Sequence, residues 1–394
     1  MVLPLKYNIR NVWVRWRATT STILGIALVV SVFVLLRALA RGIEASSGNT
    51  GDARNVLIVR KGSMAESGSL VTLDQFRTIR YFEEIAQTPA GQPLISAELV
   101  MLVSVPRRTG AGEANTLLRG VTAQGQELRS QVTLIEGRWF RRGQREVTVS
   151  RKLAQRFSGF EIGGSFKAGP DRLTVVGHFD GAGSAFDSEA WMDADEARSI
   201  FDRGEMYSSL LVRPRDAAAL VSFTNRIAQD KRLALRAESE RGYYEKQTVT
   251  AAPFKILAGL LGAAMSVGAV FAAMNTMYAS VASRTREIGT LRVLGYSRGS
   301  VVICFLLEGA LLAALGGAVG CAVAVGITMT LAARGTMFGS LDFQSFAETV
   351  YQFRITPDLI VLGMVFAVAI GLFGSLFPAL RAARLPVISA LKSL

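Results

Sequence analysis

The residue types that perform enzyme chemistry do not form a catalytic pattern in this sequence. It contains no Walker A motif, so we expect the polypeptide not to hydrolyse a nucleotide by itself. The only histidine, His178, has no cysteine near it, which favours a structural role over a metal ligand. Adjacent carboxylates such as Glu83 and Glu84 do not face each other on a helix. We therefore predict no catalytic residue, no metal site and no cofactor in this chain.

One connecting segment has a pattern that suits docking of another protein. Residues 284–299 are too many for a tight turn, and Ile288, Leu291 and Leu294 recur at helical spacing between charged positions. This spacing predicts a short amphipathic helix, and the alternative is a connector bound to lipid headgroups. The charged positions that would meet a soluble partner are Arg286, Glu287 and Arg292.

Glu308 interrupts the long apolar run that follows this segment. An ionisable residue at such a position is costly in a membrane, so it is either paired with a charge or part of a proton or ion path. Pairing with an arginine of the preceding loop is the favoured interpretation. Further along, Gly316, Gly317 and Gly320 form a small-residue pattern that permits close helix packing without identifying the partner helix.

The elements that carry these residues are membrane helices. Half of the residues are hydrophobic and only 19% are charged, and four apolar segments reach the length of about 20 residues that a crossing requires. We expect an interfacial helix at 1–18, transmembrane helices at 19–41, 253–283, 301–333 and 358–380, an outer domain at 42–252, a cytoplasmic helix at 284–300, an outer loop at 334–357 and a cytoplasmic tail at 381–394. A cleaved signal peptide ending near Ala40 is disfavoured, because the apolar run is longer than a signal peptide needs.

The positions of the basic residues predict how the chain is oriented in the membrane. The formal net charge is +13, yet residues 42–252 hold 28 Lys and Arg against 26 Asp and Glu. The excess lies beside the apolar segments, in the N-terminal segment, the loop at 284–298 and the tail, whereas the loop after the third helix is slightly acidic. By the positive-inside rule we expect both termini to be cytoplasmic and residues 42–252 to lie outside the cytoplasm. This distribution also argues against nucleic-acid binding.

The outer segment is expected to be an α+β domain. Short β-type runs at 55–59, 99–105, 146–150 and 173–179 alternate with helical stretches at 72–85, 193–201 and 216–229, and Thr72 with Gln75 predicts a capping box. Both cysteines, Cys304 and Cys321, fall on the third membrane helix, so the outer domain depends on its own core. The expected fold is thus four membrane helices with a large α+β domain inserted between the first and second.

Several stretches resemble one family. REIGTLRVLGYSRGSVV (286–302), FLLEGALLAALGGAVG (305–320) and SLFPALRAARLPVISAL (375–391) resemble the permease signature of the MacB/FtsX/LolC superfamily of ABC transporters. LIEGRWFRRGQREVTVSRKLAQRF (134–157), with IGGSF and LTVVGHF after it, resembles the MacB-like periplasmic core domain. The resemblance covers nearly the whole chain.

The resemblance implies a dimer, formed with a second permease copy or a homologue, that binds two copies of a separate ABC ATPase holding ATP and Mg. It implies that the docking segment is a coupling helix, that residues 232–246 belong to a stalk, and that a periplasmic adaptor and outer-membrane channel take part in export across the bacterial inner membrane. The alternatives are FtsX-like control of cell-wall hydrolases without transport, and LolC-like lipoprotein extraction. The coupling-helix residues would be Arg286, Glu287, Ile288, Gly289, Leu291, Arg292, Leu294 and Gly295.

Overall fold

The computed structural model describes residues 16–108, 110, 112–247, 252–333 and 355–386, which divide into two compact units. One unit contains the described residues up to Arg41, those from 252 to 333 and those from 355 to 386. The other contains residues 42–247. The interfacial helix expected before Trp16, most of the outer loop expected at 334–357 and tail residues 387–394 lie outside the described residues.

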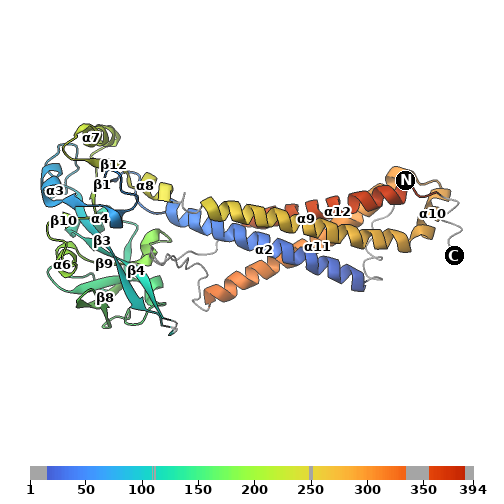
Figure 1. The fold of residues 1–394 in the computed structure, drawn as a ribbon, viewed down its shortest axis with the longest axis horizontal. Helices are drawn as coiled ribbons and strands as arrows, with labels where there is room; N and C mark the ends of the chain where they lie inside the picture. The colour runs from blue at the N-terminus through green and yellow to red at the C-terminus, as the bar shows by residue number, and fades with distance from the viewer. Residues whose placement is uncertain (1–15, 109, 111, 248–251, 334–354, 387–394) are drawn as a thin grey trace. The chain divides into compact units, whose positions relative to one another are not determined.

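The first unit consists of long helices (Figure 1). In the described part of the chain, four helices are long and apolar enough to cross a membrane. A shorter helix, α10, connects the second and third of them. The bounds are α2 Trp16–Gly48, α9 Ala252–Ser283, α10 Thr285–Val293, α11 Arg298–Ala333 and α12 Pro357–Ala383.

Helix α12 packs against the other membrane helices through positions that have no side chain. A Cβ atom placed on Gly363 would lie 2.8 Å from Val34 Cγ2 of α2, and one placed on Gly374 would lie 2.7 Å from Ala273 Cβ of α9. Such distances are shorter than a carbon–carbon contact, so only glycine permits the observed approach. About two turns before the end of α2, Arg41 donates a hydrogen bond of 2.6 Å to Thr356, just before α12 begins.

The second unit is built on one twisted sheet (Figure 1). Among its described residues, ten strands form this sheet, in the order β12-β1-β11-β3-β4-β9-β6-β8-β5 with β7 paired to β8. Pairs β4–β9 and β6–β8 are parallel, and the remaining pairs are antiparallel. The strands are β1 Val56–Arg60, β3 Ile95–Pro106, β4 Glu113–Val121, β5 Thr133–Gly137, β6 Glu146–Ser150, β7 Ser165–Ala168, β8 Asp171–Asp180, β9 Glu189–Asp193, β11 Ser209–Val212 and β12 Leu235–Ser239; β2 Val71–Thr72 pairs with β10 Met206–Tyr207.

Short helices connect the strands, and side-chain caps fix where several of them begin. Thr72 and Gln75 form the expected capping box, with Gln75 N–H donating to Thr72 Oγ1 at 3.2 Å and Thr72 N–H donating to Gln75 Oε1 at 2.8 Å. Asp193 and Asp216 cap α6 and α7. The helices are α3 Leu73–Ile79, α4 Ala123–Leu128, α5 Arg151–Ala154, α6 Ala194–Ile200, α7 Ala217–Gln229 and α8 Glu240–Gln247, with 3₁₀ turns at Glu66–Gly68 and Ala185–Ser188.

Two expectations for this domain were wrong in detail. Helix α3 ends at Ile79 and does not continue to Ile85, which forms an isolated bridge with Pro214. The segment 232–246, expected as part of a stalk, forms edge strand β12 and most of α8. Its polar composition reflects an edge position, where one side of the strand meets water.

The domain core contains ionised side chains as well as apolar ones. Arg119 and Arg129 are 1% and 0% exposed and lie among four buried glutamates on the strands and turns around them. We call this set the buried ion cluster; its members are Glu66, Glu98, Arg119, Arg129, Glu189 and Glu240. Apolar residues such as Phe186 and Trp191 pack around it. Ionised groups buried at this depth are stable only when they are fully paired.

Candidate functional site

The candidate site is helix α10, which begins and ends at defined backbone features. Arg284 occupies the position before the first residue of the helix. At the other end, Gly295 has a φ of +92°, and its N–H bonds to Arg292 O at 3.2 Å while Tyr296 N–H bonds to Leu291 O at 3.2 Å. These two bonds form a Schellman motif, which ends a helix and turns the chain.

One face of α10 is anchored among the ends of the membrane helices. Ile288 is 3% exposed and packs in a cluster with Val281 of α9, Phe305 of α11 and Ala382 of α12. Gly289 is also buried, and Leu291 and Arg292 are half-buried. Residues of three membrane helices therefore share one apolar cluster with Ile288 of α10, so a displacement of α10 requires this cluster to repack.

An ion pair forms the second anchor. Arg284 Nη1 donates to Glu308 Oε2 at 2.7 Å, and the two side chains are 4% and 7% exposed. Of the two interpretations of Glu308, the structure therefore shows the pairing with a loop arginine. The pair joins the start of α10 to a position about three turns into α11. Both charges are removed from solvent.

The opposite face of α10 is exposed and mixed in character. Arg286 and Glu287 are exposed, and Val293 and Leu294 are 62% and 69% exposed. The amphipathic pattern placed Leu294 on the same face as Ile288; this was wrong, because the helix ends at Val293 and the turn at Gly295 directs the chain away from that face. Charged residues beside exposed apolar ones are typical of a protein-docking surface.

The three glycines predicted to pack helices lie at two different contacts. Cβ atoms on Gly316 and Gly320 would lie 2.9 Å from Ile26 Cβ and 2.6 Å from Ala27 O, both on α2. A Cβ atom on Gly317 would lie 2.7 Å from a side-chain carbon of α12. The pattern thus faces α2 on one side and α12 on the other.

His178 lies beside a cavity of the outer domain. The cavity has a volume of about 360 Å³ and is lined by Arg108, Glu136, Arg151, Ala154, Gln155, Glu161 and His178. His178 Nε2 lies 2.8 Å from Phe160 O and its Nδ1 lies 3.7 Å from Glu136, and Arg108 pairs with Glu161 at 3.4 Å. These side chains are engaged with the protein itself, and among the described residues no group of acidic, histidine or cysteine side chains has the arrangement of a metal site.

Some residues important to the site were not predicted from the sequence. The sequence pattern identified Glu308 but not which arginine of the loop pairs with it, although Arg284, a basic residue at the start of the loop, was the available signal. It also missed Gly363, Gly371 and Gly374 of α12, whose spacing around Ala367 repeats the small-residue pattern.

Comparison with known proteins links both units to one family. Residues 19–230 match the model of the MacB-like periplasmic core domain, and residues 259–387 match the FtsX-like permease C-terminal model. The macrolide export ATP-binding/permease protein MacB of Chlorobium luteolum is 27% identical over 94% of this chain and 57% of its own length. The protein of the same name from Chlorobaculum tepidum is 36% identical over 30% of this chain and 16% of its own length.

The chain therefore spans less than three fifths of either of these two relatives. The crystal structure of the periplasmic region of MacB from Actinobacillus actinomycetemcomitans aligns over 51% of this chain and 94% of its own, with 13% sequence identity and a TM-score of 0.38.

Proposed function

Because this chain belongs to the ABC permeases that have a MacB-like periplasmic core domain and an FtsX-like permease domain, we propose that it couples ATP hydrolysis by an ABC ATPase to movement of its periplasmic domain. The chain is a multi-pass protein of the inner membrane with a periplasmic segment. The movement would drive export or extraction of a substrate on the periplasmic side, with a second permease copy and a periplasmic adaptor as further partners.

The observation that carries this proposal is the two-sided structure of α10. Its inner face is fixed to the membrane helices through Ile288 and through the ion pair of Arg284 with Glu308. Its outer face presents Arg286, Glu287 and Leu294 to solvent. If a soluble protein binds and displaces a helix built in this way, the displacement can be transmitted to α9, α11 and α12.

Photocrosslinking tests where the ATPase docks. A photoreactive phenylalanine analogue at Leu294 of the full chain, expressed in its native host, should crosslink to an ABC ATPase that is identified by mass spectrometry. The same group at Tyr81, which is 81% exposed in the periplasmic domain, is the matched control and should not. Crosslinks to an ATPase at neither position, with the chain correctly inserted, would contradict the proposal.

Transport and signalling give different results with the same complex. If the complex exports or extracts a substrate, its ATP hydrolysis should rise when the cargo is added. If the periplasmic domain instead regulates cell-wall hydrolases, a hydrolase should co-purify with it and cargo should have no effect. The described geometry of α10 is compatible with both, and the size and MacB-like character of the periplasmic domain favour transport.

A further inference from the structure

Part of the buried ion cluster lies at the end of the sheet where the chain enters and leaves the periplasmic domain. The chain leaves α2 at Gly48 and enters β1 at Val56, and it leaves β12 at Ser239 and enters α8, which precedes α9 in the sequence. Strands β1 and β12 are antiparallel neighbours with Val56 opposite Ser239. Antiparallel pairing therefore brings both connections to the same end of the sheet.

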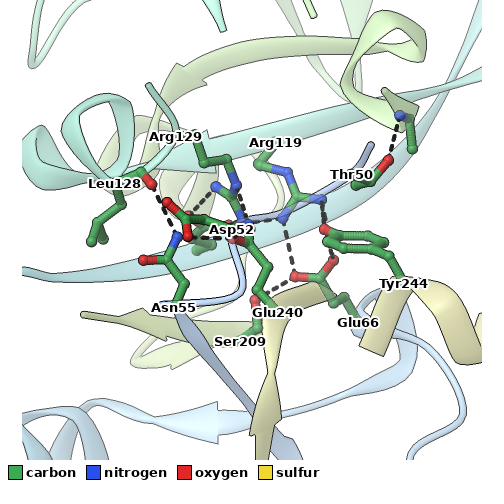
Figure 2. Close-up of polar contacts among 12 residues, drawn as sticks. Thr50, Asp52, Asn55, Glu66, Arg119, Leu128, Arg129, Ser209, Glu240 and Tyr244 are labelled. Carbon is green, nitrogen blue, oxygen red and sulfur yellow. Dashed lines mark hydrogen bonds and ion pairs between the residues drawn. The ribbon is translucent and has the colours of Figure 1, made fainter. Parts of the chain in front are cut away.

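Glu240 joins the two connections directly (Figure 2). Its Oε2 atom accepts hydrogen bonds from Asp52 N–H at 2.9 Å and from Asn55 Nδ2 at 2.8 Å, both on the segment after α2. Its own N–H donates to Asn55 O at 2.9 Å. Its Oε1 atom accepts from Arg129 Nε at 2.8 Å. One carboxylate that is 0% exposed and belongs to the outgoing connection thus bonds both to the incoming connection and to the sheet domain.

The other members of the cluster form hydrogen bonds with Arg129 and with Tyr244, which lies one turn after Glu240 on α8. Arg129 Nη1 and Nη2 donate to Glu98 at 2.5 and 3.0 Å, and Glu98 also accepts from Arg119 at 2.8 Å. Arg119 reaches Glu189 and Glu66, and the hydroxyl of Tyr244 on α8 donates to Glu66 Oε2 at 3.0 Å. Helix α8 is therefore bonded to the cluster at two positions one turn apart.

The incoming segment fits closely around the same carboxylate. Gly51 has a φ of +80°, and a Cβ atom at this position would lie 2.7 Å from Glu240 Cγ. Arg213 donates to Asn55 Oδ1 at 2.5 Å and to Asp52 at 3.2 Å, and Thr50 Oγ1 accepts from Ala185 N–H at 2.7 Å. Thr50, Asp52 and Asn55 of this segment thus each form a hydrogen bond with another part of the sheet domain.

We propose that Glu240, Arg129, Asp52 and Asn55 form a joint that makes the two connections a single mechanical unit with the sheet. The segment 49–55 and helix α8 would then open only together. If the membrane helices drive the periplasmic domain, which rests on the function proposed above, this joint prevents either connection from being pulled away from the sheet alone. The joint itself does not depend on that function and can be tested without the ATPase.

Hydrogen exchange of the full chain in lipid nanodiscs, read by mass spectrometry, tests the joint. In the unaltered protein, the amides of 49–55 and of 240–247 should exchange with the same dependence on urea, because one opening exposes both. In Glu240→Gln, exchange should rise about tenfold or more in both segments, because Arg129 loses one of its two partner charges in a buried site. Arg145→Ala removes a partly exposed ion pair with Asp171 of the same domain and is the matched control; exchange in both segments should stay unchanged.

A second variant perturbs the joint without removing a charge. Gly51→Ala should also raise exchange in both segments, because its methyl group would displace Glu240. The proposal is overturned if 240–247 exchanges faster in either variant while 49–55 does not, or if the two segments of the unaltered protein open at different urea concentrations. None of these results involves the ATPase, so a failure here leaves the proposed function standing, and a failed crosslink at Leu294 leaves the joint standing.

Discussion

The guanidinium of Arg284 and the carboxylate of Glu308 lie 2.7 Å apart with both side chains buried at the inner end of the helix bundle. The pair connects the helix that offers an exposed docking face to the third membrane helix. If the proposed function is correct, the pair lies between the docking face and the bundle, so a substitution there should separate ATPase binding from its effect on the membrane helices.

Glu308→Ala leaves the Arg284 charge buried without this carboxylate, and we expect a loss of about 3–5 kcal/mol in stability. The thermal unfolding temperature of the full chain in detergent should fall accordingly. Asp358→Asn, at the solvent-exposed pair with Arg41, is the control and should change the unfolding temperature much less. Equal shifts in the two variants would mean that burial of the Glu308 pair has no special importance.

Gly320→Ala should push α11 away from α2, because the new methyl group would meet Ala27 O at 2.6 Å. Overpacking of this kind costs about 1–3 kcal/mol, measured by the same thermal unfolding. Gly326→Ala, on the same helix with no neighbouring atom within 4 Å, is the matched control. An unfolding temperature that rises in both variants would indicate that helix propensity outweighs packing here.

Gly295→Ala places a side chain at a φ of +92°, which costs about 1–3 kcal/mol for a residue other than glycine. We expect the Schellman turn to loosen and the exposed Leu294 to lose its fixed position. Crosslinking from Leu294 to the ATPase should then decrease. Gly299→Ala, just inside α11 where φ is not positive, should leave the crosslink intact; a similar loss in both variants would argue against a role for the turn.

Acid should destabilise the periplasmic domain through Glu66. Burial alone would raise the pKa of Glu66, but the Arg119 charge and hydrogen bonds, with help from Ser209, lower this pKa to about 2. A carboxylate with a depressed folded pKa stabilises the fold fully above its ordinary pKa of 4.5 and loses that effect as the pH falls toward 2. The contribution is about 3 kcal/mol.

Ser209→Ala removes the hydrogen bond of 2.7 Å to Glu66 Oε1 and should raise the pKa of Glu66, so that acid unfolding begins at a higher pH. Tryptophan fluorescence of the full chain, titrated from pH 6 downward, measures this onset. Ser165→Ala, at an exposed contact with Arg172, should behave like the unaltered protein. An onset that does not move in Ser209→Ala would show that Glu66 does not control the acid transition.

Local patterns in the sequence predicted the membrane helices and the start of several short helices. Hydropathy located α2, α9, α11 and α12 because each is a continuous apolar run. The capping box at Thr72 and the aspartates before α6 and α7 were recognisable because a cap and its acceptor lie within a few residues of each other. The ends of helices were harder to predict from the sequence. Helix α3 ends at Ile79 because Ile85 pairs with Pro214, and α10 ends before Leu294 because the chain turns at Gly295.

The buried ion cluster could not be predicted from the sequence. Its charged side chains stand at positions spread from Glu66 to Glu240, and each looks like an ordinary surface residue in its own segment. Only the strand order of the sheet brings them together. The assignment of 232–246 to a stalk failed for the same reason, since a polar segment gives no local sign that Glu240 and Tyr244 point into a core.

The position of Glu240 and Tyr244 also has a consequence for biosynthesis. Both residues come near the end of the periplasmic segment, and Arg129 and Arg119 reach their full set of partners only when these two are present. We therefore expect the two arginines to lack part of their hydrogen-bonding partners during translocation until α8 has crossed the membrane. Completion of the domain is then tied to the arrival of α8, immediately before α9 enters the bilayer.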